Sequence, residues 1–151
     1  MRNYQVRPFE THHYLMLMDD INSTFGMRDV QIDFEKIAAN FANNGNYGRS
    51  GFCDGELLVS AGIMCPWPGL GVAWAIISGN GRKHNYFVHK AVLEGLQYFS
   101  DRLKLRRIEA NVCDDIEIAK LWVLHLGFCE ESVMPKYGPR GETFRKYVIL
   151  K

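Results

Sequence analysis

Residues 107–128 read RIEANVCDDIEIAKLWVLHLGF, and this stretch decides the fold. Its first seven residues alternate between polar and apolar side chains, which predicts a half-buried strand over 107–113. Asp114, with Glu117 three residues further on, predicts the capped start of a helix. The apolar residues that follow fall on one helical face: Ile116, Ala119, Trp122, Val123 and Leu126. Gly127 then suits the left-handed residue that ends a helix, and the next residue starts another strand.

The longest amphipathic helix is expected upstream of this stretch, over 85–103. Its apolar residues recur at helical spacing and form one stripe: Val88, Ala91, Val92, Gly95, Leu96, Phe99 and Leu103. The segment 78–81, which reads SGNG, breaks the chain ahead of this helix. A strand over 72–78 leads into the break.

The N-terminal half predicts three strands, at 4–8, 47–53 and 56–64, and Asp54-Gly55 marks a two-residue hairpin between the last two. One helix is expected to start with Thr11 as its cap, and its buried face is predicted to hold Tyr14, Leu15, Met18 and Ile21.

A second helix is expected to start at Asp33, and a C-terminal hairpin is expected to turn over 136–141. The resulting order is β-α-α-β-β-β-α-β-α-β-β. Strand–helix–strand units on an antiparallel core imply the α/β class. The expected sheet is mixed, as in α+β folds, and helices cover both of its faces.

The composition is ordinary for a soluble globular protein, with 47% hydrophobic and 23% charged residues in a chain of 151. This length fits a single domain over residues 1–151. A formal net charge of +1 gives no global field that would attract nucleic acid or a membrane surface. No apolar run approaches the ~20 residues of a membrane helix, and the N-terminus lacks the core of a signal peptide. Four single cysteines have no metal-ligand spacing. We therefore expect a cytoplasmic protein without a metal site.

The order of the elements, together with Ala119 and the Gly127-Phe128 pair, resembles the GNAT superfamily of N-acetyltransferases. The resemblance covers essentially the whole chain. It implies a GNAT-like acyl-CoA N-acyltransferase fold, acetyl-CoA as co-substrate and an amine as acceptor. It also implies that the strands 72–78 and 107–113 splay apart, because the family holds its acyl group in this gap.

The resemblance places the acyl-CoA loop between the central strand and the longest helix. Backbone N–H groups of this loop bind the pyrophosphate in the family, at a helix N-terminus with its positive dipole end. The cofactor-binding candidates follow from this alignment: Ile76, Ile77, Ser78, Arg82, Lys83, His84, Asn85 and Tyr86. Arg82 and Lys83 oppose the helix dipole unless an anion binds beside them, so we expect them to contact phosphates. The alternative is that these side chains simply point into water.

Several family positions are altered in this sequence. Phe87 and His89 stand where the family has two small residues, and His89 is the expected obstruction because it lies off the buried stripe. The family's proton-donating Tyr is replaced by Val123, which has no proton to give.

The strand 72–77 carries no acid, so the catalytic candidates lie elsewhere. Glu109 and Asp114 are the nearest carboxylates. His125 can titrate near neutral pH, although it is expected at the surface.

Two functions stay open. The first is an acetyl-CoA-dependent N-acetyltransferase, which the intact order of elements favours. The second is a GNAT-fold accessory or virion protein without catalysis, which the altered loop and Val123 favour. Residues 82–87 also resemble the divergent GNAT-like proteins of tailed bacteriophages. That resemblance implies the host cytoplasm as location and phage or host proteins as partners.

Overall fold

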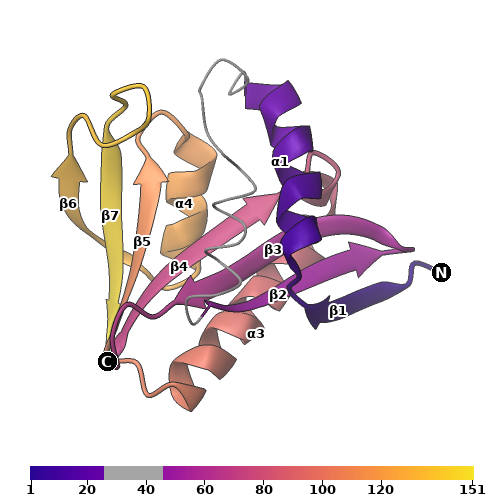
Figure 1. Ribbon diagram of the computed structural model, residues 1–151, viewed down its shortest axis with the longest axis horizontal. Helices are drawn as coiled ribbons and strands as arrows, with labels where there is room; N and C mark the ends of the chain where they lie inside the picture. Colours follow the sequence, from indigo (N-terminus) through magenta and orange to yellow (C-terminus); the bar gives the residue numbers. More distant parts are fainter. Residues whose placement is uncertain (26–45) are drawn as a thin grey trace.

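The computed structural model describes the backbone of residues 1–25 and 46–151. Its seven-stranded sheet has the order β1-β2-β3-β4-β5-β7-β6 (Figure 1). The strands are β1 (Tyr4–Pro8), β2 (Asn46–Cys53), β3 (Glu56–Met64), β4 (Leu70–Ile77), β5 (Arg107–Cys113), β6 (Cys129–Met134) and β7 (Phe144–Leu150). The helices are α1 (Thr11–Phe25), α3 (Asn85–Arg102) and α4 (Glu117–His125), and a short 3₁₀ helix, η2 (Gly81–His84), leads into α3. The helix predicted to start at Asp33 lies outside the described residues.

The mixed sheet predicted from the sequence is confirmed. β4 and β5 pair in parallel, and the other neighbouring strands pair antiparallel. Asp54 and Gly55 have φ angles of 50° and 84°, as a two-residue hairpin turn requires. β4 begins at Leu70, earlier than predicted, because its first residues already pair with Arg107 and Ile108 of β5.

The helices cover both faces of the sheet. α3 and α4 pack on one face, where Ile63, Ile108 and Phe128 belong to the largest cluster of buried side chains. α1 packs on the other face, where Leu17 lies against Phe52 of β2. None of the helices in residues 1–25 and 46–151 is long and apolar enough to span a membrane.

The start of α1 differs from the prediction. Thr11 is the first helical residue, and the backbone N–H of Glu10 before it donates to Nδ1 of His13 at 3.1 Å. Of the predicted buried face, Tyr14 is buried, Leu15 and Met18 are only half-buried, and the side chain of Ile21 lies outside the described residues. His13 and Leu17 are buried as well. The prediction is therefore confirmed for Tyr14; it missed Leu17, and it missed His13 because it assigned no buried place to a polar side chain. The Oγ of Ser50 lies 2.9 Å from the His13 Nδ1, and this polar partner allows the His13 side chain to be buried.

The start of α4 also differs. Ile116 occupies the cap position and makes no side-chain cap hydrogen bond. Asp114, the predicted cap, instead accepts hydrogen bonds from Lys120 and Arg145. Two cationic partners hold a carboxylate more strongly than one backbone N–H group, so the ion pairs take the place of the cap. Gly127 has a φ of 100°, which confirms the left-handed end of this helix.

Candidate functional site

The central parallel pair of strands separates halfway along its length. The pairing of β4 with β5 runs from Leu70↔Arg107 to Ala73↔Ala110 and goes no further. Each strand keeps its outer neighbour beyond this point: β4 stays paired to β3 as far as Ile77, and β5 stays paired to β7 throughout. The sheet therefore opens between β4 and β5, which confirms the splay predicted from the sequence.

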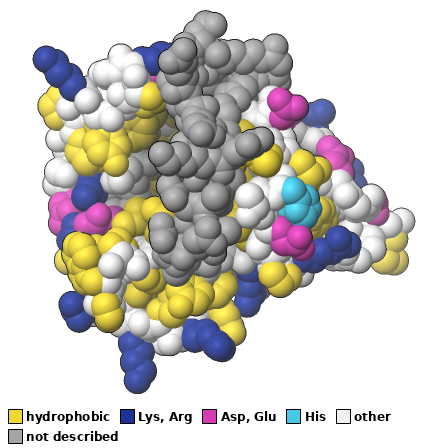
Figure 2. Space-filling view, in the orientation of Figure 1, with side chains coloured by type: hydrophobic (Ala, Val, Ile, Leu, Met, Phe, Trp, Pro, Cys, Tyr) yellow, Lys and Arg dark blue, Asp and Glu magenta, His cyan; other side chains and the backbone are white. Residues whose placement is uncertain are grey.

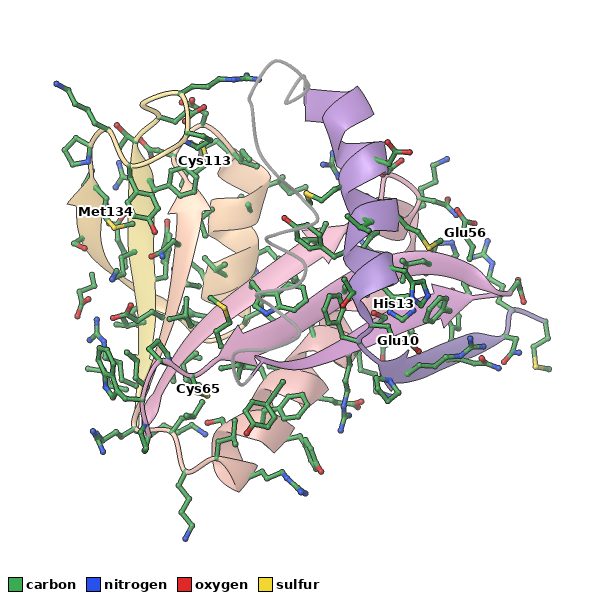
Figure 3. All side chains as sticks on the ribbon, in the orientation of Figure 1. Glu10, His13, Glu56, Cys65, Cys113 and Met134 are labelled. Carbon is green, nitrogen blue, oxygen red and sulfur yellow. The ribbon has the colours of Figure 1, made fainter. Side chains whose placement is uncertain are left out.

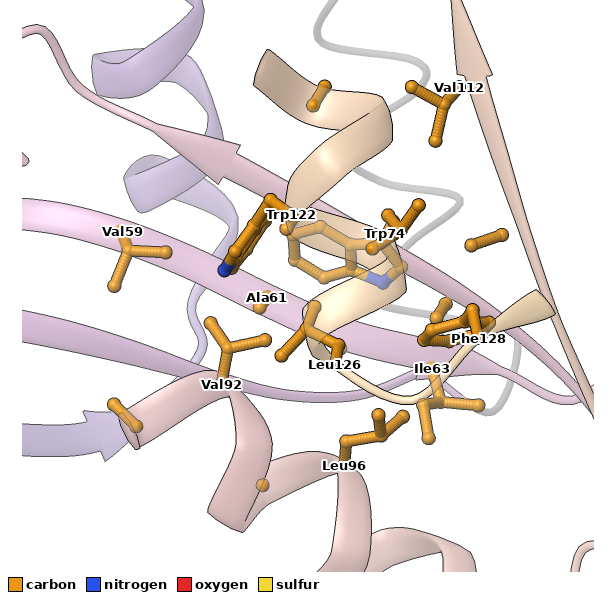
Figure 4. Close-up of a pocket in the computed structure, with 18 of the residues that line it drawn as sticks. Val59, Ala61, Ile63, Trp74, Val92, Leu96, Val112, Trp122, Leu126 and Phe128 are labelled. Atoms are coloured by element: carbon orange, nitrogen blue, oxygen red, sulfur yellow. The ribbon is translucent and has the colours of Figure 1, made fainter. Parts of the chain in front are cut away.

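A cavity of about 330 Å³ opens at this gap, between the sheet and the helices α3 and α4 (Figure 4). Many of the residues that line it are small: Ala61, Ala73, Ala91, Gly95, Ala110 and Ala119. This explains why most of the apolar stripe predicted for α3 is only half-buried, since the cavity lies beneath it. Among the described lining residues, Arg49 and Cys113 carry the ionisable side chains. Cys113 stands at the end of β5, beside the start of α4 (Figure 3).

Asn111 is the polar group that stands out in this lining. It lies on β5 just beyond the last residue that pairs with β4. Its Oδ1 is buried and has no hydrogen-bond partner, whereas its Nδ2 lies 3.3 Å from the hydroxyl of Tyr137. A buried acceptor without a donor costs stability, so this oxygen suits a ligand that brings an N–H group. Sequence reasoning missed both residues, because Asn111 reads as a solvent-facing strand position and Tyr137 as part of a turn.

Trp74 forms a second wall of the cavity from the opposite face of the sheet. Its indole lies across the neighbouring strands, over Gly62 of β3 and Gly48 of β2. A Cβ added at Gly62 would lie 2.9 Å from the indole and 2.6 Å from the carbonyl oxygen of Tyr47. Only glycine fits at position 62, because the indole and this carbonyl oxygen leave no room for a Cβ. Phe9 packs edge-on to the same indole, with the ring centroids 5.0 Å apart.

On the face of the molecule shown in Figure 2, Lys and Arg side chains lie mostly at the outer edge.

The segment predicted to form the cofactor loop folds as η2 and the start of α3. Arg82, Lys83, Asn85 and Tyr86 are exposed there. His84 is half-buried, and its Nδ1 lies 2.9 Å from the hydroxyl of Tyr4.

The predicted cofactor-binding residues at the end of β4 do not lie on one face of the sheet. Ile76 packs with Leu17 on the α1 face, whereas Ile77 packs with Val88 on the other face. Ser78 is buried, and its Oγ accepts the N–H of Gly81 at 2.9 Å.

Acceptors within the protein already bind part of the loop backbone. The N–H of Gly79 donates to the Asp20 carboxylate of α1 at 2.7 Å, and the N–H of Lys83 donates to the carbonyl of Asn80 at 3.0 Å. A carboxylate beside the loop would repel a phosphate and competes for the same donors. These occupied donors and the nearby carboxylate make the loop a poorer anion site than the sequence predicted.

The two bulky substitutions near the loop have separate roles. Phe87 turns towards the sheet, stacks on Tyr4 at 4.5 Å and packs over Gly51, so it does not fill the loop. His89 is half-buried, and its Nδ1 accepts the indole N–H of Trp122 at 3.1 Å. His89 therefore joins α3 to α4 beside the cavity.

The predicted catalytic residues do not meet in the gap. Glu109 accepts hydrogen bonds from Arg107 and Lys146. Burial alone would raise the pKa of Glu109, but the bonds from Lys146 and Arg107 outweigh it and lower the pKa. The bonds from Arg145 and Lys120 likewise lower the pKa of Asp114. Both carboxylates are thereby poor bases.

His125 is exposed, as predicted, and its Nδ1 lies 2.8 Å from the backbone carbonyl of Leu121. Val123 is buried and lines the cavity.

The sequence matches no protein-family model and none of the curated proteins. Solved structures do match. A mutant of SpeG, a spermidine N-acetyltransferase from Vibrio cholerae, has a TM-score of 0.76 at 15% identity, over 97% of this chain and 93% of that chain. An acetyltransferase of the GNAT family from Streptococcus pneumoniae has a TM-score of 0.71 at 14% identity, over 98% and 99% of the two chains. The fold is that of the GNAT acetyltransferases.

A third structure, yncA from Salmonella typhimurium with its cofactor acetyl-CoA, has a TM-score of 0.74 at 11% identity, over 97% of this chain and 93% of that chain. At identities this low the likeness concerns the GNAT fold itself. It confirms the fold expected from the sequence, including the position of the splayed β4–β5 pair at the centre of the sheet.

Proposed function

We propose that this GNAT-fold protein transfers an acetyl group from acetyl-CoA to an amine. The observation that carries the proposal is the gap between β4 and β5, which opens on an apolar cavity and holds an unpartnered amide oxygen. Support at the level of the fold comes from SpeG, a spermidine N-acetyltransferase, and from yncA with acetyl-CoA.

Within residues 1–25 and 46–151, two polar groups at the gap suit this reaction, Asn111 and Tyr137. Acetyl-CoA, when bound, supplies the thioester carbonyl that the amine nitrogen attacks. The Oδ1 of Asn111 accepts one N–H of the amine and so orients the nitrogen lone pair towards the carbonyl carbon. The hydroxyl of Tyr137, 3.3 Å from Asn111 Nδ2, gives its proton to the sulfur as the carbon–sulfur bond breaks. The surplus proton of the amine then restores the phenol. Tyr137 thus takes the role that Val123 cannot perform.

Donor binding is tested by thermal denaturation with acetyl-CoA. A ligand at 100 times its dissociation constant adds about 2.7 kcal/mol to the free energy of unfolding, which raises Tm measurably. The double variant Arg82→Ala/Lys83→Ala should weaken binding and make it less dependent on salt, because charge pairs at exposed sites are screened. Unchanged affinity in low salt would exclude these two residues from the site.

The proton donor is tested by Tyr137→Phe. It should reduce kcat by about 10²-fold or more while the Kd for acetyl-CoA stays unchanged. Tyr98→Phe is the matched control, because Tyr98 is an exposed tyrosine on α3. Equal kcat values in the two variants would remove Tyr137 from the mechanism.

A second candidate is a GNAT-fold binding protein without catalysis. The observation that favours it is the use of the loop N–H groups of Gly79 and Gly81 by Asp20 and Ser78. This candidate predicts no thermal shift with acetyl-CoA and no acetylated amine. The resemblance to bacteriophage proteins, with the location and the partners it implies, stays a prediction.

A further inference from the structure

We infer that the cavity beneath α3 and α4 is a pocket for the acyl chain of the donor, and that the protein prefers a thioester with a medium-length unbranched acyl group of about eight carbons. This inference rests on the proposed function and names its donor class. Three observations support it: the volume of the cavity, the chemistry of its lining, and a glycine in the middle of α3.

The volume exceeds the needs of an acetyl group. The cavity measures about 330 Å³. A cavity of about 150 Å³ already holds benzene, with its six carbons. Twice this volume accommodates an alkyl chain of about eight carbons with room for imperfect packing.

The lining suits methylene groups rather than the pantetheine arm of CoA. The amides of pantetheine need hydrogen-bond partners, and burying them without partners is costly. Asn111, at the gap, offers such a partner, but the walls farther in are hydrocarbon: Ile63, Leu96, Val123 and Phe128. The cavity reaches from the separated part of the strands back to Ala73 and Ala110, the last pair that β4 and β5 form. A thioester held at the gap would therefore extend its acyl chain towards the closed part of the sheet.

Gly95 keeps this space open. It lies in the middle of α3 and lines the cavity, yet a Cβ built there meets no atom within 4 Å. No close approach demands glycine at this position, and glycine inside a helix is less stable than alanine. The missing side chain leaves room that a longer residue would fill.

The experiment compares the binding of acetyl-CoA and octanoyl-CoA by calorimetry. Each buried methylene strengthens binding roughly fourfold at best. The wild type should bind octanoyl-CoA at least about tenfold more tightly than acetyl-CoA. Gly95→Leu, which places an isobutyl group in the cavity, should abolish this preference by weakening the binding of octanoyl-CoA at least about tenfold. Gln97→Leu adds the same side chain at an exposed position of the same helix and should retain the preference.

A nucleotide-free thioester separates this inference from the proposed function. Equal binding of acetyl-CoA and octanoyl-CoA would overturn the acyl pocket and leave the proposed function standing. If no CoA thioester binds, but S-octanoyl-N-acetylcysteamine raises the Tm of the wild type and not of Gly95→Leu, the pocket is supported and CoA as donor is rejected. The absence of binding by every thioester would overturn both.

Discussion

The indole N–H of Trp122 donates to Nδ1 of His89 across 3.1 Å and so joins α4 to the first turns of α3. Both helices border the cavity, and Trp122 forms part of its wall. The bond therefore sets the spacing of the two helices beside the splayed strands. His89, which by its position in the sequence could obstruct a cofactor loop, has a structural partner instead.

His89→Ala should lower the free energy of unfolding by about 1–2 kcal/mol, because it leaves a half-buried N–H group without an acceptor. In a Trp122→Phe background the same substitution should cost much less, since the donor is already gone. Urea denaturation of the four proteins measures the coupling. Strictly additive losses would show that the bond contributes nothing to stability.

Two glycine-to-alanine substitutions should have opposite effects. Gly95→Ala should stabilise the protein by up to about 1 kcal/mol, because the new methyl group meets no atom and helix propensity improves. Gly62→Ala should destabilise it by about 1–3 kcal/mol, because its Cβ would lie 2.6 Å from the carbonyl oxygen of Tyr47. Guanidinium denaturation compares them. A loss of stability in Gly95→Ala would contradict the open space beneath α3.

Asp20→Ala should strengthen the binding of CoA several-fold. The substitution releases the N–H of Gly79 and removes a negative charge beside the loop, so a phosphate group meets a donor instead of a repelling carboxylate. Asp19→Ala removes the neighbouring exposed carboxylate and serves as the control. Titration calorimetry at two salt concentrations measures the effect, and equal affinities of the two variants would exclude Asp20 from any influence on the loop.

The stability of the protein should fall between neutral and mildly acidic pH because of His13. Burial, with a smaller effect of His12, lowers the pKa of His13 in the folded state. An unfolded histidine titrates at about 6.5, so the stabilising effect of neutral His13 is complete above that pH and is lost as the pH falls through the folded pKa. Denaturation midpoints measured from pH 8 to pH 5 should show this slope. It should flatten in His13→Gln and persist in His12→Gln, whose ring is exposed in the wild type.

Glu109 should contribute stability at neutral pH that is lost in acid. Because the pKa of Glu109 is lowered in the folded protein, its contribution is present above the ordinary glutamate pKa of about 4.3 and disappears as the pH falls through the folded value. The stability difference between wild type and Glu109→Gln should therefore shrink below about pH 4. Glu117→Gln is the control, since the side chain of Glu117 is 79% exposed. A difference that does not change with pH would show that the ion pairs of Glu109 are not responsible.

Many features of the fold are determined by local sequence. The alternation over 107–113, the hairpin at Asp54-Gly55 and the left-handed Gly127 all follow from neighbouring residues, and the structure confirms each of them. Such features are readable because side-chain periodicity and φ preferences depend only on the chain nearby. The splay of β4 and β5 was also predictable, through the resemblance to the GNAT order of elements.

The contents of the site, in contrast, are decided by tertiary structure. Asn111 and Tyr137 are 26 positions apart, and only the pairing of β5, β7 and β6 brings them together. Asp114 was misread as a helix cap because its stronger partner, Arg145, lies on a strand that arrives later in the chain. The cavity is likewise invisible in the sequence: an alanine or a glycine on an apolar stripe reads as close packing, and only the distance between α3, α4 and the sheet shows that the space beneath them is left open.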